Sequence, residues 1–339
     1  MVSTNARSRR TTGKVTLEDV AKRVGVGKMT VSRALRTPEI VSEKVRLKIE
    51  EAIRELGYIP NAAARDLASA TSRNVVIVTS SISSKENILI LSALQKQLRT
   101  LDVQVMILMS DDKYWLRELM KQSPQAIVLL NFQCPEEEAQ WIQNSGILCI
   151  EVGVKQKKPL GLNIGVDCRL AMQQLIGFLA EKGYSEIALL SARQNSAIFQ
   201  QYLDSWHTAL LAQGLSSHLM LHSADEISFT TGTQLLSEAL SAWGKIDAFV
   251  FLSDELACGA IYEALRHHLI IPRDIAVAGL GDLEVGAVSY PRLTTIHIPY
   301  RELGETAGKK LVELLQSEDE GKDTKFIQLP THLVVRNSV

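Results

Sequence analysis

An alternation of apolar runs with amphipathic segments restricts the fold more than any other feature, and it occurs twice from Asn74 onward. The first series holds the runs VVIVTS, VQVMILM, QAIVLLN and ILCIEVG, with helical segments near 86–100, 113–122 and 136–144. The second holds EIALLSA, HLMLH, DAFVFLS and DIAVAGL, with helices near 169–182, 198–213, 232–242 and 255–268. Uniformly apolar strands between helices are typical of parallel sheets that are covered on both faces. The two series therefore predict two doubly wound α/β lobes.

A cleft between these lobes is the expected ligand site, because ligands of such folds bind at the carboxyl ends of the strands. The first lobe is expected to span about 74–160 together with a crossover region at 292–298. The second is expected to span about 161–291 together with the C-terminal segments, in which a helix starts near Tyr300. No heptad repeat follows the last apolar stretch, so a dimer is expected and not a tetramer.

Residues 15–59 form a separate head with the pattern of three short helices. Thr16 is a plausible N-cap that Asp19 can complete as a capping box, and Gly25 ends this first helix. Ser42 caps the third helix and Gly57 ends it. The apolar residues expected to face inward from these two helices are Leu17, Val20, Ala21, Val24, Val45, Ile49, Ala52, Ile53 and Leu56.

The second helix of the head is expected over 28–35, with Val31 and Leu35 directed inward. Two helices joined by a glycine-containing turn, with a third closing the core, are typical of a helix-turn-helix domain. The alternative is a small helical bundle with a polar face. In a helix-turn-helix domain the second helix enters the major groove, where Lys and Arg donate to guanine, Met contacts a thymine methyl, and hydroxyls bind phosphate or base. The outward residues are Lys28, Met29, Ser32 and Arg33.

The charge distribution favours the DNA-binding interpretation. Residues 1–73 hold fifteen Lys or Arg and eight Asp or Glu, whereas the remaining residues hold twenty-two and thirty. A basic head on an acidic body suggests a polyanionic partner, although a basic segment is often only a solvated tail, as residues 1–14 are expected to be.

The segment 60–73 is expected to be a hinge. Pro60 stops the third helix, Asn61 can cap a new one, and Ala62 to Ala70 is too short for a stable isolated helix. Its one large apolar residue, Leu67, could act as a wedge between base steps of the minor groove. The alternative is a passive linker with one buried leucine.

Other classes of function find little support in the sequence. The first fourteen residues do not resemble a signal peptide, and eighteen apolar residues never run together, so a cytoplasmic protein without a membrane span is expected. The four cysteines are far apart and indicate no metal site or disulfide. GxGxxG, GxxxxGK[ST] and GxSxG motifs are absent, so neither an enzyme nor a cofactor is expected.

The whole chain resembles the lactose-repressor (LacI/GalR) family of regulators, most specifically in VTLEDVAKRVGVGKMTVSRALRTPEIVSEKVRLKIEEAIRELGYIPNAAARDLAS. KMTVSRALR and AGLGDLEVG are most similar to its gluconate-type branch. The resemblance implies a hinge that folds on operator DNA in a dimer, with paired leucines opening a base step. One departure is Gly27, where Ser or Thr is common and would add a phosphate contact. The candidate DNA-binding residues are Thr16, Gly27, Lys28, Met29, Thr30, Ser32, Arg33, Asn61, Ala64 and Leu67.

The same resemblance implies an effector cleft, here with departures. Many members carry an arginine that binds sugar hydroxyls, and the matching positions here are Gln200 and Tyr202. An aspartate that is common in the family is replaced by Gly281, with Asp282 next to it. If the effector is a sugar acid, its carboxylate needs a cation, for which Arg193 is the first candidate and Lys85 the second. The alternative for Arg193 is a surface loop arginine. The candidate ligand-binding residues are Ser80, Lys85, Glu151, Arg193, Gln200, Tyr202, Asp254, Asp282 and Tyr300.

These observations together predict a cytoplasmic, homodimeric transcription regulator, by resemblance a repressor. It would bind a pseudo-palindromic double-stranded operator and release it when a sugar or sugar acid changes the lobe angle. Two alternatives remain. One is a DNA-binding protein with a degenerate cleft, controlled by a partner protein or by abundance. The other is a solute-binding protein, against which the basic head argues.

Overall fold

The computed structural model describes residues 15–60, 72–110, 114–193, 196–317 and 326–339. The chain divides into two compact units, the first ending at Thr71 and the second beginning at Ser72. The boundary falls inside the predicted hinge 60–73. None of the described helices is long and apolar enough to span a membrane.

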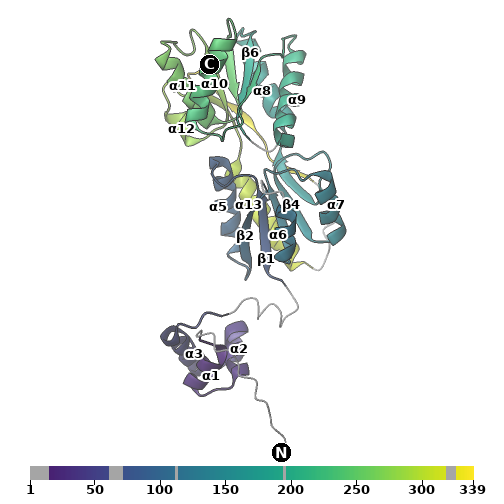
Figure 1. Ribbon diagram of the computed structural model, residues 1–339, viewed down its shortest axis with the longest axis vertical. Coiled ribbons are helices and arrows are strands. Elements are labelled where there is room, and N and C mark those ends of the chain that lie inside the picture. The colour runs from purple at the N-terminus through teal and green to yellow at the C-terminus, as the bar shows by residue number, and fades with distance from the viewer. Residues whose placement is uncertain (1–14, 61–71, 111–113, 194–195, 318–325) are drawn as a thin grey trace, which may run out of the picture. The chain divides into compact units, whose positions relative to one another are not determined.

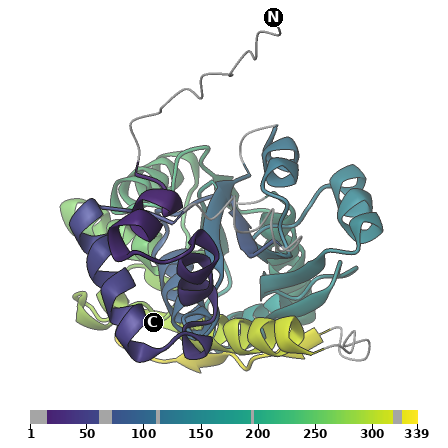
Figure 2. The same cartoon turned by 90° about the horizontal axis from the view of Figure 1, so that it is seen from below.

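The described part of the first unit, residues 15–60, holds three α-helices, drawn in purple and blue in Figure 2. They are α1 (Leu17–Val24), α2 (Lys28–Arg36) and α3 (Glu43–Leu56), with a short 3-10 turn, η1 (Pro38–Ile40), between the last two. The capping box is confirmed: the backbone N–H of Thr16 donates to the Asp19 carboxylate at 2.8 Å. Gly25 and Gly57 have φ angles of 76° and 64° and end α1 and α3 in the left-handed conformation that glycine adopts without strain.

The core of this unit differs from the prediction at one position of α2. Val31 is buried as expected, but Leu35 is 36% exposed and Ala34 is buried in its place. Positions three apart on a helix share a face, and the small Ala34 lets α2 lie close to its neighbours. The predicted inward position of Leu35 is therefore wrong. The buried core residues are Val20, Ala21, Val31, Ala34, Ile49 and Ala52.

The first lobe of the second unit is a six-stranded parallel sheet in the order β11-β5-β4-β3-β1-β2. Along β1, Val75 and Ile77 face one core while Val76 and Val78 face another, because successive side chains of a strand point to opposite faces. The apolar run is thus explained by helices on both sides. The elements are β1 (Asn74–Thr79), α5 (Lys85–Leu98), β2 (Gln104–Met109), α6 (Trp115–Lys121), β3 (Ala126–Leu130), α7 (Glu136–Ser145), β4 (Leu148–Val154), β5 (Leu162–Val166), α13 (Tyr300–Gln316) and β11 (Phe326–Gln328).

The second lobe repeats this plan in the order β12-β10-β9-β8-β6-β7, with only the β10–β12 pair antiparallel. Figure 1 shows α8 to α11 around this sheet. The elements are α8 (Cys168–Glu181), β6 (Ile187–Ser191), α9 (Ser196–Ala212), β7 (Met220–His222), α10 (Phe229–Ala242), β8 (Ala248–Phe251), α11 (Asp254–Arg266), β9 (Ala276–Gly281), α12 (Glu284–Val288), β10 (Thr294–His297) and β12 (His332–Val334).

The lobe boundaries differ from the predicted ones. Strand β5 pairs with β4, so the first lobe continues to Val166 and does not end near 160. Strand β10 pairs with β9, which places 294–297 in the second lobe and not in the first. The C-terminal segments are divided between the lobes. Helix α13, yellow-green in Figure 1, packs on the blue α5 of the first lobe, and β11 joins the first sheet whereas β12 joins the second.

Candidate functional site

The surface of the first unit that could meet DNA is the outward face of α2. Lys28, Met29 and Arg33 are exposed there, Met29 by 62%. Neither Lys28 nor Arg33 forms an ion pair with another residue of the described part of the chain. Two uncompensated cations and an apolar side chain on one exposed helical face are suited to phosphate, guanine and thymine-methyl contacts.

The other predicted DNA-binding residues near α2 have structural partners or partial burial. The Thr16 hydroxyl donates to Asp19 at 2.7 Å, and Ser32 accepts a hydrogen bond from Arg36 at 2.8 Å. Thr30 is half-buried, and Gly27 is the N-cap of α2 without a side-chain hydrogen bond. The predicted contacts of Asn61, Ala64 and Leu67 lie outside the described residues.

A cavity of about 560 Å³ separates the two lobes of the second unit, a size typical of small-molecule sites. Serines that follow β1 line it from the first lobe, and the segment after β6 lines it from the second. The cavity thus lies at the carboxyl ends of strands, where the doubly wound fold predicts a ligand. The lining polar residues are Ser80, Ser81, Ser83, Ser84, Glu86, Asn87, Ser110, Asn131, Arg193, Tyr202, Glu226 and Tyr300.

The first-lobe wall is held rigid by a network of amides. Asn131 donates to the Asn87 side chain at 2.7 Å, and Asn87 donates to the Ser81 carbonyl at 2.7 Å. The backbone of Gly153 passes so close that a Cβ there would lie 2.0 Å from the Asn131 side-chain oxygen. Amides and hydroxyls fixed in this way can exchange hydrogen bonds with ligand hydroxyl groups without reorganising.

Among the described residues, the second-lobe wall supplies one cation. Arg193 follows β6, and its Nη2 donates to Glu226 Oε1 at 2.7 Å. Both side chains are more than half exposed, so solvent weakens this ion pair. Tyr202 reaches the cavity from α9, and burial raises the pKa of its phenol well above the ordinary value, so the hydroxyl stays neutral.

The structure brings four of the nine predicted ligand-binding residues to this cavity: Ser80, Arg193, Tyr202 and Tyr300. Lys85 and Gln200 are exposed and do not belong to the described lining, and Gln200 donates to Asp204 at 2.7 Å. Glu151 is buried but does not belong to the described lining, and it accepts a hydrogen bond from the backbone N–H of Leu160 at 2.8 Å.

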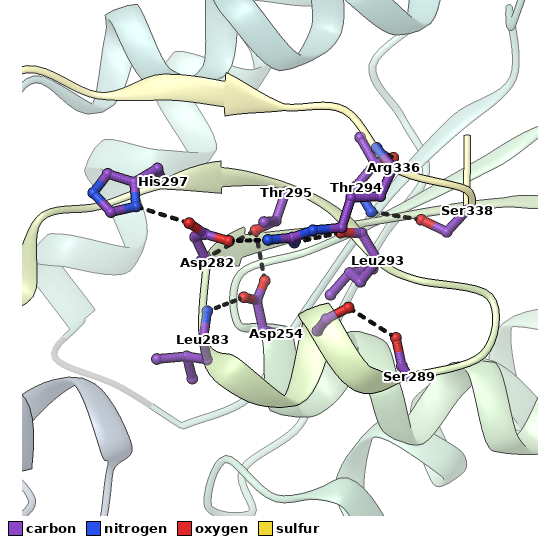
Figure 3. Close-up of polar contacts among 11 residues, drawn as sticks. Asp254, Asp282, Leu283, Ser289, Leu293, Thr294, Thr295, His297, Arg336 and Ser338 are labelled. Carbon is purple, nitrogen blue, oxygen red and sulfur yellow. Dashed lines mark hydrogen bonds and ion pairs between the residues drawn. The ribbon is translucent and has the colours of Figure 1, made fainter.

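Asp254 and Asp282 also stand at strand ends, yet the structure places them in a polar network inside the second lobe (Figure 3). Asp254 accepts hydrogen bonds from the Leu283 backbone and the Thr295 hydroxyl, both at 2.6 Å. Asp282 binds Arg336 and lies 2.9 Å from a ring nitrogen of His297. Their carboxylates therefore connect the turn after β9 to β10 and to the segment that follows β12. Neither Asp254 nor Asp282 belongs to the described cavity lining.

The polar lining residues that were not predicted are Glu86, Asn87, Asn131, Glu226, Ser81, Ser83, Ser84 and Ser110. A signal for the first two was present, because they directly follow the serine-rich segment after a predicted strand. Helix α5 begins at Lys85, one residue before the predicted start at 86, with Ser84 as its N-cap. Lys85 is exposed, whereas the next two residues, Glu86 and Asn87, are buried. The register of that first turn decides which residue reaches the cavity.

Comparison with known proteins supports these assignments. Residues 16–61 match the family model described as "Bacterial regulatory proteins, lacI family", and residues 176–339 match a periplasmic binding protein-like domain. The HTH-type transcriptional regulator GntR of Pseudomonas aeruginosa is 30% identical, over 94% of this chain and 94% of its own length. The chain belongs to the LacI family.

Further relatives agree with this family assignment. GntR of Escherichia coli (strain K12) is 30% identical over 89% of this chain and 92% of its own length. The crystal structure of the lac repressor dimer bound to operator and the anti-inducer ONPF superposes with a TM-score of 0.81 and 27% identity, covering 96% of this chain and 99% of that one. The predicted fold and the prediction of a LacI-family DNA-binding regulator are thereby confirmed.

Two buried carboxyl groups of this LacI-family chain predict a pH-dependent stability. Burial raises the pKa of Glu151 and of Asp254 to about 7, so the folded chain holds these protons more tightly than the unfolded chain. Their contribution to the stability of the fold is complete below the unfolded pKa values near 4 and is lost as the pH rises to about 7. We expect the melting temperature to fall between about pH 4 and about pH 7, with an upper limit of about 4 kcal/mol for each group. Calorimetry should show a flatter curve for Glu151→Gln, and an unchanged curve would contradict the assignment of that group.

Proposed function

We propose that the chain is a cytoplasmic, homodimeric repressor of carbohydrate or sugar-acid utilisation that releases its operator when a sugar acid occupies the inter-lobe cavity. On DNA, two copies of α2 would lie in successive major grooves of a pseudo-palindrome. The exposed Lys28, Met29 and Arg33 support this role for α2. Asn61, Ala64 and Leu67 would complete the interface in the minor groove.

Apolar side chains exposed on both lobes support the proposed homodimer. On the first lobe, Ile88 of α5 and Ile107 of the edge strand β2 are nearly half exposed. On the second lobe, Leu265 of α11 is 70% exposed and Tyr290 beyond α12 is 95% exposed. Large apolar side chains in water are favourable sites of association between subunits.

The proposal that the ligand is a sugar acid rests on Arg193. It is the one cationic side chain among the described residues that line the cavity, and amides and hydroxyls make up most of the remaining polar lining. Its partner Glu226 is 62% exposed and can turn into solvent at little cost when a ligand carboxylate takes its place. A guanidinium binds a carboxylate through two parallel hydrogen bonds, which gives both affinity and orientation.

Thermal unfolding of the full chain with D-gluconate tests this proposal. A ligand at about 100 times its dissociation constant should stabilise the chain by roughly 2.7 kcal/mol, which raises the melting temperature by several degrees. Arg193→Ala should remove the rise because the carboxylate then has no counter-charge.

The matched control is Arg273→Ala. Arg273 is also exposed and paired, with Asp274 at 3.0 Å, but it does not belong to the described lining of the cavity. This variant should respond to gluconate like the wild type. A wild-type chain that responds to no sugar or sugar acid would instead favour a regulator whose cleft has lost its ligand and which a partner protein or abundance controls.

A further inference from the structure

One acidic side chain in the cavity wall has no structural explanation of its own. Glu86 is the second residue of α5 and is only 8% exposed. Its Oε1 accepts a hydrogen bond from the Ser253 hydroxyl at 3.3 Å, across the boundary between the lobes. Its Oε2 is shielded from solvent and has no hydrogen-bond partner in the described part of the chain.

The surroundings of Glu86 offset the effect of its burial only in part. Burial raises the pKa of its carboxyl, and only hydrogen bonds from Ser253, from Ser84 and from the backbone oppose this effect. The cavity cation Arg193 is already bound to Glu226. A buried acceptor without a donor lowers the stability of the fold relative to an acceptor that is hydrogen-bonded. Such atoms are rare in folded proteins and often have a functional role.

We propose that Glu86 is the specificity-determining residue of the cavity: its Oε2 accepts a hydrogen bond from a hydroxyl group of a polyhydroxylated ligand, while its Oε1 keeps the bond to Ser253. This inference rests on the proposed function of the cavity as an effector site. It adds a requirement for a hydroxyl donor to the requirement for a carboxylate that Arg193 imposes. A site built around a hydroxyl rejects analogues without it, because the buried acceptor is then left unpaired.

The position of Glu86 also connects ligand recognition with the arrangement of the lobes. Glu86 belongs to the first lobe through α5, and Ser253 belongs to the second as the N-cap of α11. Ser253 in turn accepts a hydrogen bond from the backbone N–H of Glu255 at 3.2 Å, which fixes its hydroxyl. A ligand hydroxyl on Oε2 therefore binds to a carboxylate that already joins both lobes, and occupancy should favour the arrangement in which the two lobes share Glu86.

The test compares the full-length wild type with Glu86→Gln and Glu86→Met at about pH 8, where an ordinary carboxyl is ionised. D-Gluconate and D-glucitol are the probes, since they share the hydroxyl groups of C2 to C6 and differ at C1, where gluconate has a carboxylate and glucitol a hydroxyl group. Gln keeps an oxygen for Ser253 and removes the charge, whereas Met has a similar length and removes both oxygens. Melting temperatures of the empty chains and affinities from calorimetric titration are the two readouts.

We expect the empty Glu86→Gln chain to melt at or above the wild-type temperature, because an unpaired buried charge has been removed. Affinity for both probes should fall at least tenfold in Glu86→Gln and further in Glu86→Met. Glu151→Gln is the matched control. Glu151 is also buried, but it accepts a hydrogen bond from the Leu160 backbone and is absent from the described cavity lining, so this variant should bind the probes like the wild type.

Two results would overturn the inference. One is a lowered melting temperature of the empty Glu86→Gln chain, which would make Glu86 a structural residue. The other is unchanged probe affinity in both variants. Failure of the wild type to bind either probe would reject the proposed sugar-acid effector. In that case the melting temperature of the empty Glu86→Gln chain still tests the role of Glu86. A raised melting temperature supports an acceptor that awaits a ligand, and a lowered melting temperature overturns the inference.

Discussion

Gly304→Ala is expected to destabilise the second unit by about 2–3 kcal/mol and to lower its melting temperature by roughly 4–12 °C. A Cβ at Gly304 would lie 2.2 Å from the backbone oxygen of Ile90 and 2.9 Å from the Ala93 Cβ. A backbone oxygen inside a helix cannot turn aside, so α13 would have to move away from α5. One turn later, Gly308 approaches the Gln97 side chain and the Leu94 oxygen in the same way.

Two effects of opposite sign compete in this substitution. Alanine favours a helix over glycine by about 1 kcal/mol, which alone would stabilise α13. The clash is larger, because separating the helices removes the contacts of Leu303, Ala307 and Leu311, all fully buried. Glu86 on α5 and Tyr300 on α13 both line the cavity, so the same movement should also weaken binding of gluconate.

Gly177→Ala is the matched control for the helix propensity alone. Gly177 lies inside α8, and a Cβ there would meet nothing within 4 Å. Differential scanning calorimetry should show a small stabilisation for this variant, about 0.5–1 kcal/mol. If Gly304→Ala behaved in the same way, the close approach of α13 to α5 would not be a property of the protein in solution.

The contrast between well and poorly predicted features follows from the range of the interactions involved. The ends of α1 and α3 were predicted correctly because Asp19, Gly25 and Gly57 act on backbone within one helical turn. The membership of β5 and β10 was not, because an apolar run indicates a strand but not the sheet that it joins. Strands β5 and β10 pair with the strands that precede them in the chain, β4 and β9, and this pairing depends on the packing of the whole lobe and not on the residues of the strand alone.

The cavity shows the same limit at the level of single side chains. Arg193 and Tyr202 were identified from their positions near strand ends and from the family pattern, and both line the cavity. Asp254 stands at an equivalent strand end but turns inward to the Leu283 N–H and the Thr295 hydroxyl. A carboxylate can satisfy backbone donors as well as a ligand, and the sequence alone does not distinguish these uses.

Arg33→Ala is expected to reduce affinity for the operator roughly ten- to hundredfold, equivalent to about 1–3 kcal/mol, and to relax discrimination at one base pair. Arg33 is exposed on the outward face of α2 and forms no ion pair with any described residue. Its removal should therefore leave the fold of the first unit intact, so that lost affinity reports on lost DNA contacts. Lys28→Ala is expected to have a similar effect at the start of the same helix.

The experiment begins with operator sequences selected by the full-length wild type from randomised duplex DNA. Affinities of each variant for the selected site, for its single-base substitutions and for unrelated DNA are then measured at several salt concentrations. Arg54→Ala is the matched control, because Arg54 is an exposed arginine of the same unit that belongs to α3 and not to α2. It should lose only the small, sequence-independent affinity that one positive charge contributes.

The dependence on DNA sequence separates the two possible roles of Arg33. A guanine contact predicts that Arg33→Ala binds the selected site and one of its base substitutions with nearly equal affinity, while discrimination at the other positions is retained. A phosphate contact predicts an equal loss on every sequence and a salt dependence reduced by about one charge. The second result would assign Arg33 to the DNA backbone and leave base recognition on α2 to Lys28 and Met29. Met29 is 62% exposed and offers an apolar surface to a thymine methyl group.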